Sequence, residues 1–213
     1  MLRPRPTVIA LACAAVLLPA CDKKEEASTP AASDSKKDED PKEDDLGAAE
    51  QYMRKSKASE ARVQLAKLSD SAAAYFMEEH VSRDGTPQPH RCPSDGNAEG
   101  KGTVTPPLST KCNDGPKGNC SAGGSGPGSY DAALWLDNQL WQELNFAIEG
   151  GHRYHYNFVW KNDPAGFGSC QFTAQAFGDL DGDGLFSTYE RSGKLDADGF
   201  TPGVGLYIDR ELE

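Results

Sequence analysis

Residues Tyr52–Phe76 read YMRKSKASEARVQLAKLSDSAAAYF, and this stretch decides the fold because it specifies one long amphipathic helix. No proline follows Leu46 before about His80, and no glycine follows Gly47 in that interval, so we predict a helix over this whole length. Apolar residues recur every three or four positions, as in a helix with one apolar face. They are Ala58, Ala61, Leu65, Leu68, Ala72 and Tyr75.

The C-terminal part of the chain predicts β-strands. In HRYHYNFVW (152–160) and CQFTAQAF (170–177), apolar and polar residues alternate with the period of a strand. LFSTYER (185–191) and VGLYIDREL (204–212) continue the series, and connections rich in Gly and Asp separate the runs. We therefore predict an α+β fold, in which the long N-terminal helix packs on a C-terminal antiparallel sheet of about four strands.

Between these parts, Val81–Tyr130 is rich in Gly, Pro, Ser and Asn, which predicts a long irregular region. Four cysteines follow the first 50 residues, and an even number in an exported chain predicts two disulfides. The short loop around GPKGN favours the pairing Cys112–Cys120 with Cys92–Cys170 among the three possible connectivities. A four-cysteine zinc site is the alternative, although the chain has no Cys-x-x-Cys pair.

The N-terminal segment 1–20 predicts a signal peptide. It places two arginines before a short apolar run from Val8 to Leu18, and Leu18-Pro19-Ala20 precedes Cys21. This arrangement resembles a bacterial lipoprotein signal, which implies cleavage before Cys21 and attachment of acyl chains to that residue. Several acyl chains would anchor the protein firmly to a membrane, the inner or the outer one. An ordinary secretory signal with an incidental cysteine is the alternative.

Residues 21–50 mix both signs of charge and contain almost no large apolar side chains, so we predict a disordered tether between the anchor and a folded domain at 51–213. The formal net charge of the 213-residue chain is −11. A negative charge of this size argues against nucleic acid as a partner.

The stretch GDLDGDGLFSTYE (178–190) matches the Asp-x-Asp-x-Asp-Gly pattern of calcium loops, with a glutamate at the last position. Oxygen ligands arranged round a glycine-permitted bend suit a hard cation. Because both flanks alternate like strands, the loop is expected to join two strands, and a plain hairpin turn at Asp183-Gly184 is the alternative to calcium. The predicted metal ligands are Asp179, Asp181, Asp183, the carbonyl of Leu185, Ser187 and Glu190.

Two histidines lie near the first predicted strand, His152 and His155. Their spacing of three places them on opposite faces of a strand, which makes them poor partners for one metal. We expect ordinary surface or edge histidines, and we find no set of nucleophile, base and oxyanion donors that would predict an enzyme.

The stretch from Tyr52 quoted above, together with CQFTAQAFGDLDGDGLFSTYERSG from Cys170, resembles the type IV pilin and pseudopilin family. The resemblance covers most of Tyr52–Glu213 and implies a helix packed on an antiparallel meander. It does not extend to the N-terminus, because a cysteine and a polar tether stand where pilins carry a cleavage site and a continuous apolar half-helix.

The chain is thus expected to be a non-enzymatic, lipid-anchored, pilin-like protein with a binding or structural role, displayed in the periplasm or on the cell surface. An accessory component of a type IV pilus or type II secretion apparatus, with pilins or secretion proteins as partners, is the alternative. An envelope hydrolase is a third hypothesis, for which the chain offers no convergent catalytic residues.

Overall fold

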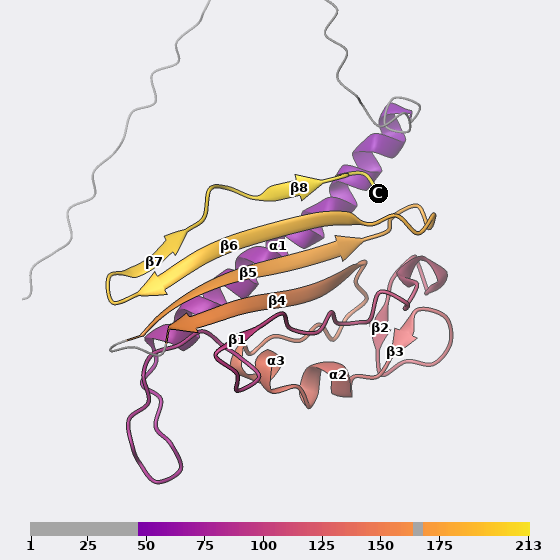
Figure 1. The fold of residues 1–213 in the computed structure, drawn as a ribbon. Helices are drawn as coiled ribbons and strands as arrows, with labels where there is room; N and C mark the ends of the chain where they lie inside the picture. Colours follow the sequence, from indigo (N-terminus) through magenta and orange to yellow (C-terminus); the bar gives the residue numbers. More distant parts are fainter. Residues whose placement is uncertain (1–46, 164–167) are drawn as a thin grey trace, which may run out of the picture. The chain divides into compact units, whose positions relative to one another are not determined.

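The computed structural model describes residues 47–163 and 168–213 (Figure 1). The predicted signal peptide, Cys21 and most of the predicted tether lie outside these ranges. The described part combines α-helix with an antiparallel sheet and two disulfides, which confirms the α+β class.

Helix α1 spans Ala48–Met77 and runs behind the sheet in the view of Figure 1. It begins inside the segment predicted as tether (21–50). Phe76 rather than Tyr75 completes the buried stripe, because the ring of Tyr75 remains partly exposed. At the end of the helix, ring nitrogens of His80 and His90 lie within hydrogen-bond distance of the carbonyls of Tyr75 and Phe76, which satisfies part of its last turn. The buried stripe consists of Ala58, Ala61, Leu65, Leu68, Ser69, Ala72 and Phe76.

Three long strands form the centre of the sheet. They are β4 (Tyr154–Asp163), β5 (Ser169–Gly178) and β6 (Ser187–Asp196), joined as an antiparallel meander. The short strand β1 (Glu99–Gly100) pairs with the outer edge of β4. Among the described residues, no helix combines the length and the apolar character needed to cross a lipid bilayer.

The sheet ends differently from the predicted four-strand meander. Both β7 (Gly199–Pro202) and β8 (Tyr207–Asp209) pair with β6, so two short strands share one edge. Strand β7 lies in a segment that was predicted to be a loop between two strands. Phe200 stacks on Phe172 with ring centroids 5.9 Å apart, and the lack of a side chain at Gly193 permits this, because a Cβ there would lie 2.4 Å from the Phe200 ring.

The two faces of the sheet differ. On the inner face, the Tyr156 hydroxyl donates to Glu60 of α1 at 3.1 Å, and the Arg62 guanidinium lies over the Tyr189 ring. On the outer face, Asn157 of β4 is buried as well, because its Nδ2 donates to the carbonyl of Lys101 in the irregular region. The predicted alternation of buried and exposed residues therefore holds along β5 but not along the first part of β4.

Short elements order the irregular region below β4 in Figure 1. A 3-10 turn η2 (Cys112–Asp114) is followed by the parallel pair β2 (Ser121–Ala122) and β3 (Ser129–Tyr130). The helices α2 (Ala133–Leu136) and α3 (Gln139–Glu143) come next.

A side-chain cap fixes the start of helix α3. The side chain of Asn138 accepts a hydrogen bond from the amide of Leu140 at 3.0 Å. Leu140, Trp141 and Leu144 are buried and anchor this segment in the core.

Two disulfides hold the irregular region in place. Cys92–Cys170 ties it to strand β5, and Cys112–Cys120 closes a local loop. This is the pairing that the sequence favours. All four cysteines are buried in the core cluster.

Candidate functional site

The loop between β5 and β6 brings three of the six predicted metal ligands together. Asp179, Asp181 and Asp183 each offer a carboxylate oxygen, and these oxygens lie within 4.8 Å of one another. Gly182 and Gly184 have φ angles of +83° and +91°, a left-handed conformation that glycine adopts at little cost and that lets the chain wind tightly here.

These carboxylates already accept hydrogen bonds from their own loop. Asp179 accepts from the amides of Gly182 and Gly184, at 2.7 and 3.1 Å. Asp181 Oδ1 accepts from the amide of Asp183, and Asp181 Oδ2 lies 3.3 Å from the Arg54 guanidinium of α1. Part of the negative charge of the loop is therefore balanced without a metal ion.

Two of the other predicted ligands have partners of their own. Ser187 opens strand β6, and its hydroxyl donates to the carbonyl of Gly178 at 3.0 Å. Glu190 lies further along β6, where its carboxylate accepts from Gln175 Nε2 at 2.6 Å. Because β6 begins at Ser187, Glu190 continues along the sheet, whereas a helical flank would turn the glutamate back toward the loop. Calcium binding by the loop, with the Leu185 carbonyl as a ligand, stays a prediction.

A second feature is the polar outer face of the sheet. Asn157, Gln175 and Glu190 are in register across β4, β5 and β6, and hydrogen bonds join each to the next. At the next cross-strand pair on this face, the hydroxyls of Thr173 and Ser192 lie 2.9 Å apart. These side chains thus form an ordered polar network, and in Figure 1 helix α1 lies on the other side of the sheet.

This surface contains a shallow groove of about 410 Å³. Lys161, Gln171 and Lys194 are in register across its floor, beside Val159. The two lysines form ion pairs at the rim, Lys161 with Glu99 at 3.8 Å and Lys194 with Asp196 at 2.9 Å. The groove therefore offers amide, hydroxyl and ammonium groups to a polar ligand.

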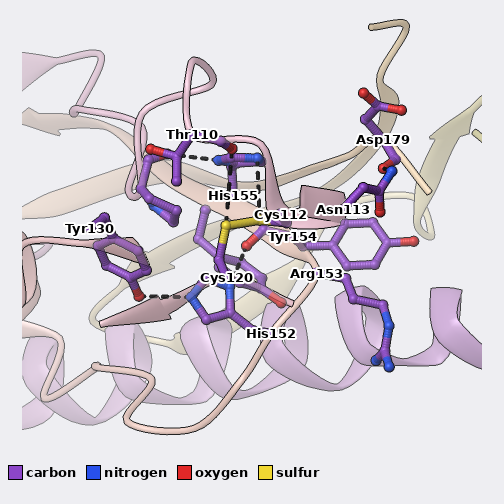
Figure 2. Close-up of a disulfide and its surroundings, with 12 residues drawn as sticks. Thr110, Cys112, Asn113, Cys120, Tyr130, His152, Arg153, Tyr154, His155 and Asp179 are labelled. Atoms are coloured by element: carbon purple, nitrogen blue, oxygen red, sulfur yellow. Dashed lines mark hydrogen bonds between the residues drawn. A yellow bond between two sulfur atoms is a disulfide. The ribbon is translucent and has the colours of Figure 1, made fainter. Parts of the chain in front are cut away.

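The third feature, shown in Figure 2, is the Cys112–Cys120 disulfide with two buried histidines. His152 and His155 are 1% and 2% exposed, so the predicted surface histidines are buried. The reason is that segments far earlier in the chain cover them: Cys120 forms a β-bridge with His152, and the Pro106 carbonyl accepts from His155 Nδ1 at 2.9 Å. Burial lowers the pKa of both imidazoles.

Each histidine has a defined set of partners. His152 Nδ1 lies 2.8 Å from the Tyr154 carbonyl, and His152 Nε2 lies 2.7 Å from the Tyr130 hydroxyl. Trp135 Nε1 in turn donates to the Tyr130 hydroxyl at 2.7 Å. The Nε2 of His155 lies 3.7 Å from Cys112 Sγ (Figure 2).

A small cavity of about 60 Å³ opens beside this disulfide. Cys112 and His155 line it together with Phe186, whose ring contacts the His155 ring edge-on. Asp179 of the aspartate loop reaches the same cavity, and Asn113 Nδ2 donates to the Asp179 carbonyl. No local sequence pattern predicts this site, because its residues come from segments tens of positions apart.

Comparison with protein-family models, with curated proteins and with solved structures identifies no match to this chain.

Proposed function

We propose that this chain is a lipid-anchored, pilin-like protein of the bacterial envelope, which binds a partner or organises surface structures and catalyses no reaction. The proposal joins two lines of support. The first is the N-terminal sequence, in which a short apolar run (Val8–Leu18) is followed by Cys21. The second is the architecture of the described domain, a long helix on one face of an antiparallel meander.

The proposed binding role is based on the difference between the two faces of the sheet, one packed and one exposed. The inner face is packed against α1, whereas the outer face bears the groove with Lys161, Gln171 and Lys194. Gln171, Ser192 and Lys194 are exposed there, although they belong to central strands of the sheet. An ordered polar surface on a rigid sheet can bind a partner without large rearrangement.

The buried histidines support a structural rather than a catalytic role. His152 is held between Tyr130 and a backbone carbonyl, and His155 between a backbone carbonyl and a disulfide sulfur. Among residues 47–163 and 168–213, no serine, threonine or free thiol lies within hydrogen-bond distance of either ring. General-base activation of a nucleophile needs that contact.

The anchor is tested by changing Cys21 in the full chain. Cys21→Ser should abolish incorporation of a labelled fatty acid and release the protein from membranes, because position 21 no longer offers a thiol to the acyl chains. Cys13→Ser is the matched control, since Cys13 lies inside the apolar run and should leave labelling unchanged. Labelling and membrane association that persist in Cys21→Ser would overturn the proposal. Separation of inner and outer membranes in the same experiment identifies the membrane that holds the protein.

Deletion of the gene distinguishes the proposal from the alternative of an accessory pilus or secretion component. The alternative requires that piliation, motility or type II secretion fail in the deletion strain and recover on complementation. We expect all three to continue without the protein, because the chain lacks the continuous apolar half-helix that builds a pilus fibre in the family it resembles.

A further inference from the structure

His152 and His155 carry their ring hydrogen on the same nitrogen, Nδ1. Each Nδ1 faces a backbone carbonyl, of Tyr154 and Pro106 respectively, and a carbonyl oxygen can only accept. Each Nδ1 must therefore carry the hydrogen. Both rings are at least 98% buried, and burial favours the neutral imidazole, so each Nε2 presents a lone pair.

The two lone pairs meet different partners. At His152, the Tyr130 hydroxyl supplies a hydrogen to Nε2, and Trp135 Nε1 supplies one to the Tyr130 oxygen, so every group of this chain is satisfied. At His155, the partner is Cys112 Sγ at 3.7 Å. A disulfide sulfur carries no hydrogen, so two acceptors face each other.

Reduction of the disulfide changes this contact. Cys112 then bears a hydrogen, and its thiol can donate to His155 Nε2 or transfer the proton to it. The 3.7 Å separation is suitable for a sulfur donor. The hydrogen bond exists in the reduced protein alone, so it stabilises the dithiol relative to the disulfide.

We propose that Cys112–Cys120 is a site of thiol–disulfide exchange, in which Cys112 and His155 form a thiol–imidazole pair on reduction, whereas Cys92–Cys170 is purely structural. The reductant would be a dithiol. Its first thiolate attacks the Sγ of Cys112, the cysteine of this bridge that lines the cavity, and Cys120 leaves as a thiolate and takes up a proton. The second thiolate of the reductant then attacks the mixed disulfide and forms a cyclic disulfide. Cys112 leaves beside His155 and takes up the second proton, so the two protons and two electrons of the dithiol are accounted for.

The second disulfide lacks these features. Within the described residues, no histidine or other titratable side chain hydrogen-bonds to the sulfur of Cys92 or Cys170. The sequence separation is 78 residues, against 8 for Cys112–Cys120. Since a long closed loop restrains the unfolded chain more than a short one, opening the short loop costs the fold less.

The charged groups round the cavity are two cations and two carboxylates, Lys111, Arg153, Asp114 and Asp179. Opening of the short loop would also loosen the bond from Asn113 to the Asp179 carbonyl. Exchange at this disulfide is therefore expected to alter the aspartate loop.

The test is a redox titration of the purified full chain with mixtures of reduced and oxidised dithiothreitol, followed by alkylation and mass mapping of each cysteine. Cys112 and Cys120 should become alkylated at a reduced-to-oxidised ratio at least about tenfold lower than Cys92 and Cys170. Coincident reduction of the two bridges, or earlier reduction of Cys92–Cys170, would overturn the proposal. This comparison needs no variant.

Matched variants then identify the histidine responsible. His155→Phe should shift the Cys112–Cys120 equilibrium about tenfold toward the disulfide, because the reduced thiol loses its acceptor. His152→Phe also removes a buried imidazole but leaves the sulfur contact intact, so its equilibrium should stay within about twofold of the parent. Circular dichroism establishes that both variants fold. Equal shifts in the two variants would show that the effect is a general loss of packing and would contradict the thiol–imidazole pair.

Discussion

At the scale of single residues, hydrogen-bond chemistry separates groups that the sequence presents as equivalent. His152 and His155 lie three positions apart, and both donate from Nδ1 to a backbone carbonyl. Only the partner of Nε2 differs, a hydroxyl in one case and a disulfide sulfur in the other. That difference gives the His152 ring a purely structural role and places the His155 ring beside the disulfide that we propose to undergo exchange.

The buried state of these rings predicts a pH dependence of stability. Their folded-state pKa values lie below the ordinary 6.5, mainly because burial disfavours the imidazolium. Below pH 6.5 the unfolded chain therefore binds protons that the folded chain does not, and the free energy of unfolding falls as the pH decreases. Above that pH this contribution is fully present.

Nitrogen-15 NMR of the histidine rings at pH 6 measures this directly. Both His152 and His155 should be less protonated than a histidine in a model peptide at that pH, and their neutral form should carry the hydrogen on Nδ1. Urea unfolding at pH 7.5 and pH 5.5 should show lower stability at the lower pH. A ring that is protonated to the same extent as the model peptide, or that carries its hydrogen on Nε2 when neutral, would refute the assignment.

The sequence could not predict these histidine environments, for a physical reason. Alternation along a strand reports which residues share a face, but burial of a face depends on what covers it. Here the cover comes from Pro106, Cys112 and Cys120, in a region without regular structure. Local patterns therefore assigned His155 to the correct strand and the wrong environment.

At the scale of secondary-structure elements, helix α1 is best tested through its buried stripe. Leu65 is 0% exposed and Val63, two residues earlier, is 64% exposed. Leu65→Ala should lower the free energy of unfolding by about 2–5 kcal/mol, since it leaves a cavity between helix and sheet. Val63→Ala on the outer side of the helix is the control and should change it by less than about 0.5 kcal/mol. Equal effects of the two substitutions in urea unfolding would mean that the helix does not pack as described.

The loop between β5 and β6 gives the calcium prediction. If Asp179, Asp181 and Asp183 bind the ion in the folded state only, calcium at a hundredfold excess over its Kd adds about 2.7 kcal/mol of stability. A chelator should then lower the melting temperature, and calcium should restore it better than magnesium does. Asp181→Asn should blunt that response, whereas Glu190→Gln should not, because Glu190 is bonded to Gln175. A melting curve unchanged by chelator and by millimolar calcium would mean that the loop is a turn that binds no calcium.

This loop also shows which features a local sequence pattern can predict and which it cannot. The aspartate spacing correctly places a tight turn with Gly182 and Gly184, because those residues suit left-handed backbone. The position of Glu190 depends on whether a strand or a helix follows. A ligand motif defined for a helical flank therefore loses its last member when the flank is β6.

At the scale of the whole molecule, the central feature is a sheet with one face packed on α1 and the other largely open to solvent. The helix and the long strands were predictable, because each has a regular period of apolar residues. The edge arrangement was not, because β7 is held by the stacking of Phe200 on Phe172 across Gly193, a long-range contact. The polar outer face is the surface on which the proposed binding role depends.

The most direct measurement places a photo-crosslinking amino acid at Gln171, on the outer face, in the full chain in its native envelope. The same amino acid at Val63, exposed on the far side of α1, is the control. The proposed role predicts a discrete crosslinked species from Gln171 that is missing from Val63 and lost when Thr173→Arg obstructs the groove. No adduct from Gln171, or the same adducts from both positions, would contradict the claim that this face binds a partner.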